Sequence, residues 1–70
     1  MELIKEDRET GVDLYREARA EPDGGVVFLY RFRALRRLPE HLTPADLADG
    51  QAALVAFDQI VSWLKTNPQD

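Results

Sequence analysis

The chain has 70 residues, no cysteine, a single histidine and a formal net charge of −4 at pH 7. This length predicts one small domain over residues 1–70, which is marginally stable unless a disulfide, a metal or a partner adds to its core. The cysteine count excludes disulfides and thiolate zinc sites, and one histidine does not make a metal site by itself. We therefore expect no metal and no cofactor, and the acidic balance argues against general nucleic-acid binding.

The segment MELIKEDRET has no apolar run of the kind found in signal peptides. The longest apolar run covers residues 52–57, far fewer than the roughly 20 residues of a membrane-spanning helix. We therefore expect a soluble cytoplasmic protein without membrane contact. Arginine outnumbers lysine by seven to two, which we interpret as the composition of a GC-rich bacterial or phage coding sequence.

Three strand-like runs come first, at about residues 2–6, 12–20 and 26–38, and Pro39 ends the third. The turn signals DRETG and EPDGG separate them, because glycine accepts a positive φ and proline presets its own φ. Closing EPDGG symmetrically puts Leu14 opposite Phe32. Closing DRETG in the same way puts Ile4 opposite Leu14, so the sequence predicts a meander in one consistent register.

This register divides the predicted sheet into two faces. The expected core face holds Ile4, Val12, Leu14, Ala18, Val26, Phe28, Tyr30, Phe32 and Ala34. The expected outer face holds Leu3, Tyr15, Val27, Leu29, Arg31, Arg33, Leu35 and Arg37.

A helix is predicted over about residues 44–66, with Thr43 as N-cap and Pro44 in the first helical position. A break at Asp49–Gly50, with a main helix from about Gln51, is the alternative. Apolar residues recur at helical spacing and form one stripe that should cover the core face: Leu54, Phe57, Ile60, Val61 and Leu64. The predicted fold is α+β, a three-stranded antiparallel β-meander followed by one C-terminal α-helix packed on one face (β-β-β-α).

The outer face carries more apolar side chains than a solvated face requires, among them Leu3, Tyr15, Val27 and Leu29. Either this patch binds a partner, or the loop at residues 38–42 folds back over it. Arg31 and Arg33 on the same face either contact phosphates or pair across strands with Asp13 and Glu17.

Trp63 points away from the apolar stripe, on the side of the helix that also carries the small residue Ala56. Small residues allow a second helix to approach closely, and a tryptophan beside them can anchor such a contact. The alternative is that Trp63 caps the edge of the sheet within one chain.

Nothing in the sequence predicts catalysis, since the only serine, Ser62, has no neighbouring histidine and no phosphate-binding glycine motif occurs. We expect a small non-catalytic protein-interaction module, a homodimer and/or an inhibitor or adaptor of another protein, of phage or mobile-element origin. The predicted partner-binding residues are Leu3, Tyr15, Val27, Leu29, Arg31, Arg33, Ala56 and Trp63.

The alternative is a nucleic-acid-binding domain that uses the arginine-bearing outer face. A three-stranded sheet packed on one C-terminal helix resembles the arm-type DNA-binding domains of phage and transposon integrases. The resemblance concerns the arrangement of elements alone, and this chain departs from it in its acidic charge.

Overall fold

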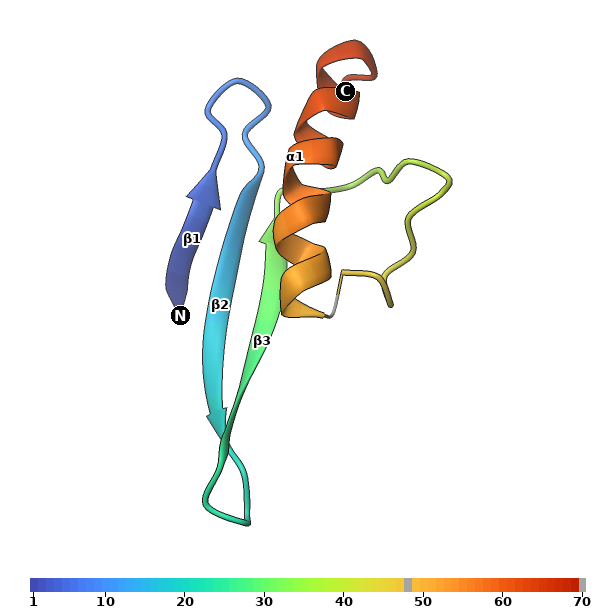
Figure 1. Ribbon diagram of the computed structural model, residues 1–70. Helices are drawn as coiled ribbons and strands as arrows, with labels where there is room; N and C mark the ends of the chain where they lie inside the picture. Colours follow the sequence, from blue (N-terminus) through green and yellow to red (C-terminus); the bar gives the residue numbers. More distant parts are fainter. Residues whose placement is uncertain (48, 70) are drawn as a thin grey trace.

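The computed structural model describes residues 1–47 and 49–69. In these residues the order of elements is β1 (Glu2–Glu6), β2 (Asp13–Ala20), β3 (Val26–Arg33) and α1 (Gly50–Thr66). The strands form one antiparallel sheet in the order β1-β2-β3, and α1 lies across one of its faces (Figure 1). The structure confirms the predicted α+β fold, a meander followed by a C-terminal helix.

The β2–β3 hairpin has the predicted register. The N–H of Glu21 donates to the carbonyl oxygen of Gly25 at 2.9 Å, and the N–H of Gly24 donates to that of Glu21 at 3.0 Å. Gly24 has a φ of +91°, a conformation that glycine adopts without steric penalty. This turn places Leu14 opposite Phe32 and Ala18 opposite Phe28, as predicted.

The β1–β2 register departs from the prediction after its first pairs. Glu2 lies opposite Arg16 as predicted, but an irregularity between Leu3 and Lys5 then places Lys5, and not Ile4, opposite Leu14. Lys5 therefore turns to the helix side, where its ammonium lies 5.6 Å from the ring centroid of Phe57 and 3.4 Å from a carboxylate oxygen of Asp58. An extra residue in one strand is a β-bulge, which a symmetric turn closure does not foresee.

The DRETG turn is held by the carboxylate of Asp7. One of its oxygens accepts hydrogen bonds from the hydroxyl and the N–H of Thr10, both at 2.8 Å. The hydroxyl and then the N–H of Thr10 lower the pKa of Asp7, because both donate to the ionised form.

β3 ends at Arg33 rather than near Leu38. Ala34 has a φ of +64°, so the chain leaves the sheet there, and the predicted pairing of Ala34 with Val12 does not extend the ladder. The following loop runs along the flank of the helix (Figure 1). Four of its leucines pack against the core: Leu35, Leu38, Leu42 and Leu47. Residues 38–42 therefore do not cover the outer face of the sheet.

The helix starts later than Pro44. Residues 44–47 form a turn, in which the carboxylate of Asp46 accepts from the N–H of Thr43 at 2.8 Å. The actual N-cap is Asp49, whose side chain accepts from the N–H groups of Gln51 and Ala52. The alternative start near Gln51 thus agrees within one residue, while Ala48 lies outside the described residues.

The core lies between α1 and the base of the β2–β3 hairpin. Leu14, Ile60 and Val12 are its largest fully buried side chains, and Phe32 stacks on Phe57 with ring centroids 6.3 Å apart. In the described residues the buried hydrophobic cluster consists of Val12, Leu14, Ala53, Ala56, Phe57, Ile60, Val61 and Leu64.

The predicted core face is only partly covered. Ile4 is half-buried outside the buried cluster, and four predicted core residues are exposed: Ala18, Val26, Phe28 and Ala34. For Ala18, Val26 and Phe28 the reason is the position of Gly50, the first residue of α1, while Ala34 lies where the chain leaves the sheet. A Cβ at Gly50 would lie 2.6 Å from Cε1 of Tyr30, so the helix begins against this ring and the hairpin continues beyond it (Figure 1).

Thr10→Val removes the hydroxyl donor to Asp7 and lowers the urea midpoint at pH 7. A carboxylate with a depressed native pKa stabilises the fold above its unfolded pKa and loses that contribution as the pH falls. The difference from wild type should therefore shrink as the pH falls below 3.8. Arg8→Ala, an exposed change in the same turn, is the control, and an equal difference at pH 7 and in acid contradicts this account.

Gly50→Ala places a methyl group against Tyr30 and lowers the free energy of unfolding by about 1–3 kcal/mol, the usual effect of overpacking. Urea unfolding measures it, with Gln51→Ala at the exposed neighbouring position as the control. Pairing Gly50→Ala with Tyr30→Ala should make the two losses less than additive. Unchanged stability of Gly50→Ala would show that the ring does not fix the helix start.

Candidate protein-binding surfaces

Six of the residues predicted on the outer face lie together on the side of the sheet away from α1, whereas Leu35 packs against the core. We call this group the outer surface: Leu3, Tyr15, Val27, Leu29, Arg31 and Arg33. Register places Leu3, Tyr15 and Arg31 side by side across the three strands. Leu3 and Val27 are 44% and 39% exposed, while Tyr15 and Leu29 are half-buried.

The charges on the outer surface are mixed. The Nε of Arg31 lies 3.8 Å from a carboxylate oxygen of Glu17. Arg33 lies opposite Asp13, and its guanidinium carbon is 5.1 Å from the ring centroid of Tyr15. Each arginine thus has an acidic or aromatic partner within the sheet, and the surface carries no basic excess of the kind that follows a phosphate backbone.

Arg36 and Arg37 do not join this surface, although Arg37 was expected there. Arg36 donates from Nη2 to the carbonyl oxygen of Gln69 at 2.6 Å, and Arg37 donates from Nη1 to that of Pro68 at 2.7 Å. The guanidinium carbon of Arg37 also lies 5.3 Å from the ring centroid of Trp63. The four arginines of residues 31–37 are therefore divided between the sheet and the C-terminal segment.

The two predicted helix residues take different positions. Trp63 is half-buried, packs against the core and lies under Arg37, so its ring is partly covered within one chain. Ala56 is 3% exposed and belongs to the core, so it does not offer a surface to a partner. The two residues are not parts of one exposed helix face.

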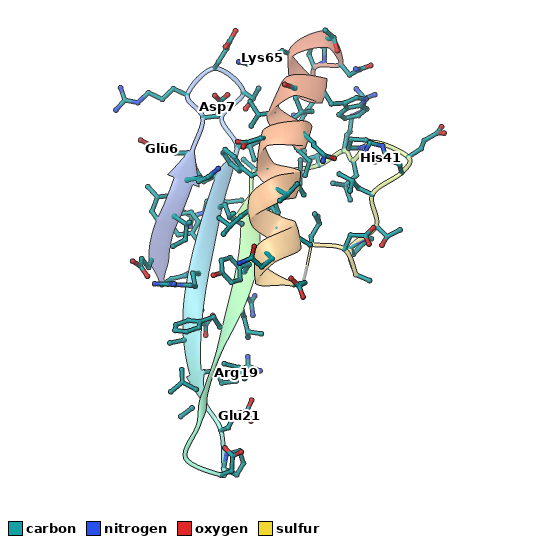
Figure 2. All side chains as sticks on the ribbon, viewed as in Figure 1. Glu6, Asp7, Arg19, Glu21, His41 and Lys65 are labelled. Carbon is teal, nitrogen blue, oxygen red and sulfur yellow. The ribbon has the colours of Figure 1, made fainter. Side chains whose placement is uncertain are left out.

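A second surface, which we did not predict, is the helix side of the hairpin where it extends beyond α1 and β1. We call residues 17–29 the arm. It accounts for the elongated shape of the molecule, 44 × 24 × 17 Å, and Arg19 and Glu21 mark its far end (Figure 2). On its helix side Val26 and Phe28 are 58% and 48% exposed.

Arg16 lies where the arm meets the base. Its guanidinium carbon is 4.6 Å from the ring centroid of Phe28, and it forms an ion pair with Glu2. Glu2, followed by Tyr30, raises the pKa of Arg16 through hydrogen bonding. These contacts hold one flank of Phe28 and leave the rest of the ring exposed.

An apolar groove of about 360 Å³ lies beside the last residues of β3. Tyr30 and Phe32 form its sheet wall, and the loop after β3 supplies the rest. The loop residues are Leu35, Arg36, Leu38, Pro44 and Leu47. This groove was not predicted, because the leucines that line it were assigned to a strand and to a helix.

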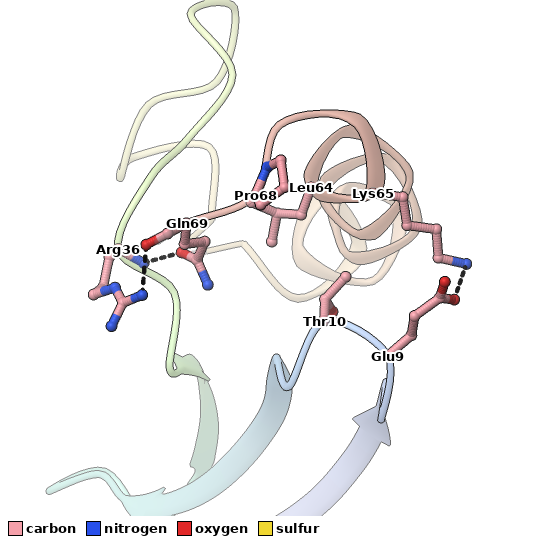
Figure 3. Close-up of a pocket in the computed structure, with 7 residues that line it drawn as sticks. All are labelled: Glu9, Thr10, Arg36, Leu64, Lys65, Pro68 and Gln69. Atoms are coloured by element: carbon pink, nitrogen blue, oxygen red, sulfur yellow. Dashed lines mark hydrogen bonds and ion pairs between the residues drawn. The ribbon is translucent and has the colours of Figure 1, made fainter.

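A second hollow of about 280 Å³ lies at the C-terminal end of α1 (Figure 3). On one side Lys65 forms an ion pair with Glu9 at 3.2 Å. On the other, the side-chain oxygen of Gln69 accepts from the N–H of Arg36 at 2.6 Å, and its amide donates to the carbonyl of Ala34 at 2.8 Å. The polar groups that line this hollow bind one another, so we interpret its role as structural and not as ligand binding.

Within residues 1–47 and 49–69, no group of three or more His, Cys, Asp or Glu side chains is arranged to hold a metal ion. In the same residues no helix has the length and apolar character needed to cross a membrane. His41 lies on the loop, with its Nε2 3.4 Å from the side-chain oxygen of Gln59.

Comparison with known proteins adds no assignment, since no family model, curated protein or solved structure matches this chain. The candidate surfaces therefore stand on their own geometry.

Gln69→Ala removes the side-chain bonds that hold the chain after β3 and lowers the free energy of unfolding by about 1–2 kcal/mol. Ala34→Gly raises stability, because glycine adopts the left-handed conformation without a Cβ clash. In the Ala34→Gly background the loss caused by Gln69→Ala should be smaller. Urea unfolding tests both, with Gln51→Ala as control, and strict additivity would show that Gln69 does not support Ala34.

Proposed function

We propose that this protein is a small non-catalytic protein-interaction module that acts as a homodimer, binds another protein, or does both. The exposure of Val26, Val27 and Phe28 on the arm is the observation that supports this proposal most strongly. These side chains lie on both faces of a hairpin that no other element of the described chain covers. Exposed apolar patches rimmed by charge are typical of interaction sites.

The distribution of charge favours a protein partner over a nucleic acid. Arg31 and Arg33 have Glu17 and Asp13 beside them, and Arg36 and Arg37 bind the C-terminal segment. The outer surface thus combines apolar side chains with balanced charges, the composition of a protein interface. An inhibitor or adaptor role, a phage or mobile-element source and a cytoplasmic location remain predictions from composition.

Capture from a lysate of the source cell, with the protein immobilised, tests partner binding. We expect wild type to retain either itself or a defined partner, and Val27→Asp combined with Phe28→Asp to lose it, because both side chains are exposed on the arm. Val55→Asp is the matched control, because Val55 is 58% exposed on the helix, away from both surfaces. Equal retention by all three proteins, or no retention of any protein by wild type, would contradict the proposal.

Titration with single- and double-stranded oligonucleotides at low salt separates the two functions. We expect no binding. An affinity that falls steeply with salt, and that Arg31→Ala combined with Arg33→Ala abolishes, would replace the proposed function with nucleic-acid binding.

A further inference from the structure

The two edges of the sheet differ in how they are protected against pairing with another strand. β1 has five residues, contains a bulge and turns Lys5 toward the helix side. Shortness, bulges and inward-turned charges are features that discourage strand addition. β3 has eight residues in unbroken register with β2, contains no lysine or proline, and has only apolar or aromatic side chains on its helix side. β3 is therefore the unprotected edge.

The backbone groups on this edge are free to pair. The bond from Glu21 to Gly25 marks a hydrogen-bonded pair, and such pairs alternate along an antiparallel ladder. The odd-numbered residues of β3 thus bond to β2, and the even-numbered ones turn their N–H and C=O groups outward. These are Val26, Phe28, Tyr30 and Phe32. In the described residues no backbone hydrogen bond from outside the sheet reaches them.

The same four residues carry two complementary features. Val26 and Phe28, at the start of β3, are exposed, while Tyr30 and Phe32, at its end, form one wall of the apolar groove. The strand thus presents an apolar projection at one end and an apolar groove at the other. A two-fold axis through the middle of the strand exchanges these ends, which is what a self-complementary interface requires.

We propose that β3 pairs antiparallel with β3 of a second copy of this chain, about a two-fold axis at Leu29. The two three-stranded sheets then form one continuous sheet of six strands. Phe28 lies opposite Tyr30 of the second copy, and Val26 lies opposite its Phe32, so the exposed pair of each copy extends the wall of the other's groove. This inference rests on the proposed function, for which it names the partner and the surface.

Charge selects this register among the alternatives. The N–H and C=O groups that point away from β2 in one copy must hydrogen-bond to the corresponding groups of the other copy. The two-fold axis can therefore pass only through a residue position, and each such register keeps the helix sides of the two sheets on the same side. An axis at Arg31 would place this arginine directly opposite its copy, and an axis at Tyr30 would make the two copies of Arg31 diagonal neighbours. With the axis at Leu29, Arg31 lies opposite Val27 and Arg33 lies opposite Gly25.

An axis at Phe28 would also separate the arginines. It would pair only residues 26–30 of the strand, and the groove at Phe32 would receive no side chain from the second copy. The register centred on Leu29 therefore uses the most edge groups while keeping the guanidinium groups apart.

Sedimentation or light scattering over about 1–200 µM measures the self-association, which depends on concentration. We expect a wild-type dimer, and Phe28→Glu should weaken its association by at least about tenfold, because an aromatic anchor at an interface is replaced by a charge. Arg16 beside Phe28 offers this carboxylate a partner, which keeps the monomer folded. Val55→Glu is the control and should remain dimeric, and circular dichroism checks the fold of each variant.

Single cysteines test the register, since the chain has no cysteine of its own. Leu29 faces its copy as a non-hydrogen-bonded pair, with Cα atoms about 4.5 Å apart, a separation that a disulfide spans. Under mild oxidation Leu29→Cys should therefore form a covalent dimer. Val27→Cys should not, because its two copies are offset by four residues, about 14 Å along the strands.

A monomer at every concentration, or cross-linking at Val27 as efficient as at Leu29, overturns this inference. A monomer that still retains a different protein through the outer surface would overturn it and leave the proposed function standing. If Phe28→Glu abolishes binding of a different protein while wild type stays monomeric, the β3 edge belongs to that protein and not to a second copy.

Discussion

The contact between Gly50 and the ring of Tyr30 determines how far the helix extends over the sheet. Because no side chain separates them, α1 begins directly on β3 and runs back over the base of the hairpin. The buried hydrophobic cluster lies between α1 and this base. The hairpin beyond Tyr30 has the same alternation of apolar side chains but no helix to cover it. One backbone position thus divides a single amphipathic sheet into a packed base and an uncovered arm.

The parts of the fold that were predictable from sequence depend on local chemistry. EPDGG specifies a turn with a left-handed glycine, and the register of β2 and β3 follows from it. The helical stripe through Phe57, Ile60 and Leu64 faces the sheet as its spacing indicates. These features need only the φ preferences of a few residues and the periodicity of a helix.

The parts that were missed depend on contacts between distant segments. The bulge at Ile4 lets Lys5 reach Phe57 and Asp58, and a pattern within β1 does not show this. Ala34 takes a left-handed conformation beside Gln69, which lies 35 residues further along the chain. Tyr15, Leu29 and the two sheet arginines were placed on the correct face because they follow the hairpin register. Ala56 was misplaced because a helical wheel does not show how much of the helix the loop between β3 and α1 covers.

The contact between β2 and α1 also affects the folding rate of the chain. Val12 and Leu14 come from the first quarter of the sequence, and their partners on the helix come from the last third. The intervening chain must close a long loop before these contacts form, and such closure is entropically unfavourable. Folding should therefore be limited by the docking of α1 on the sheet, because the hairpin contacts are local in sequence and those between β2 and α1 are not.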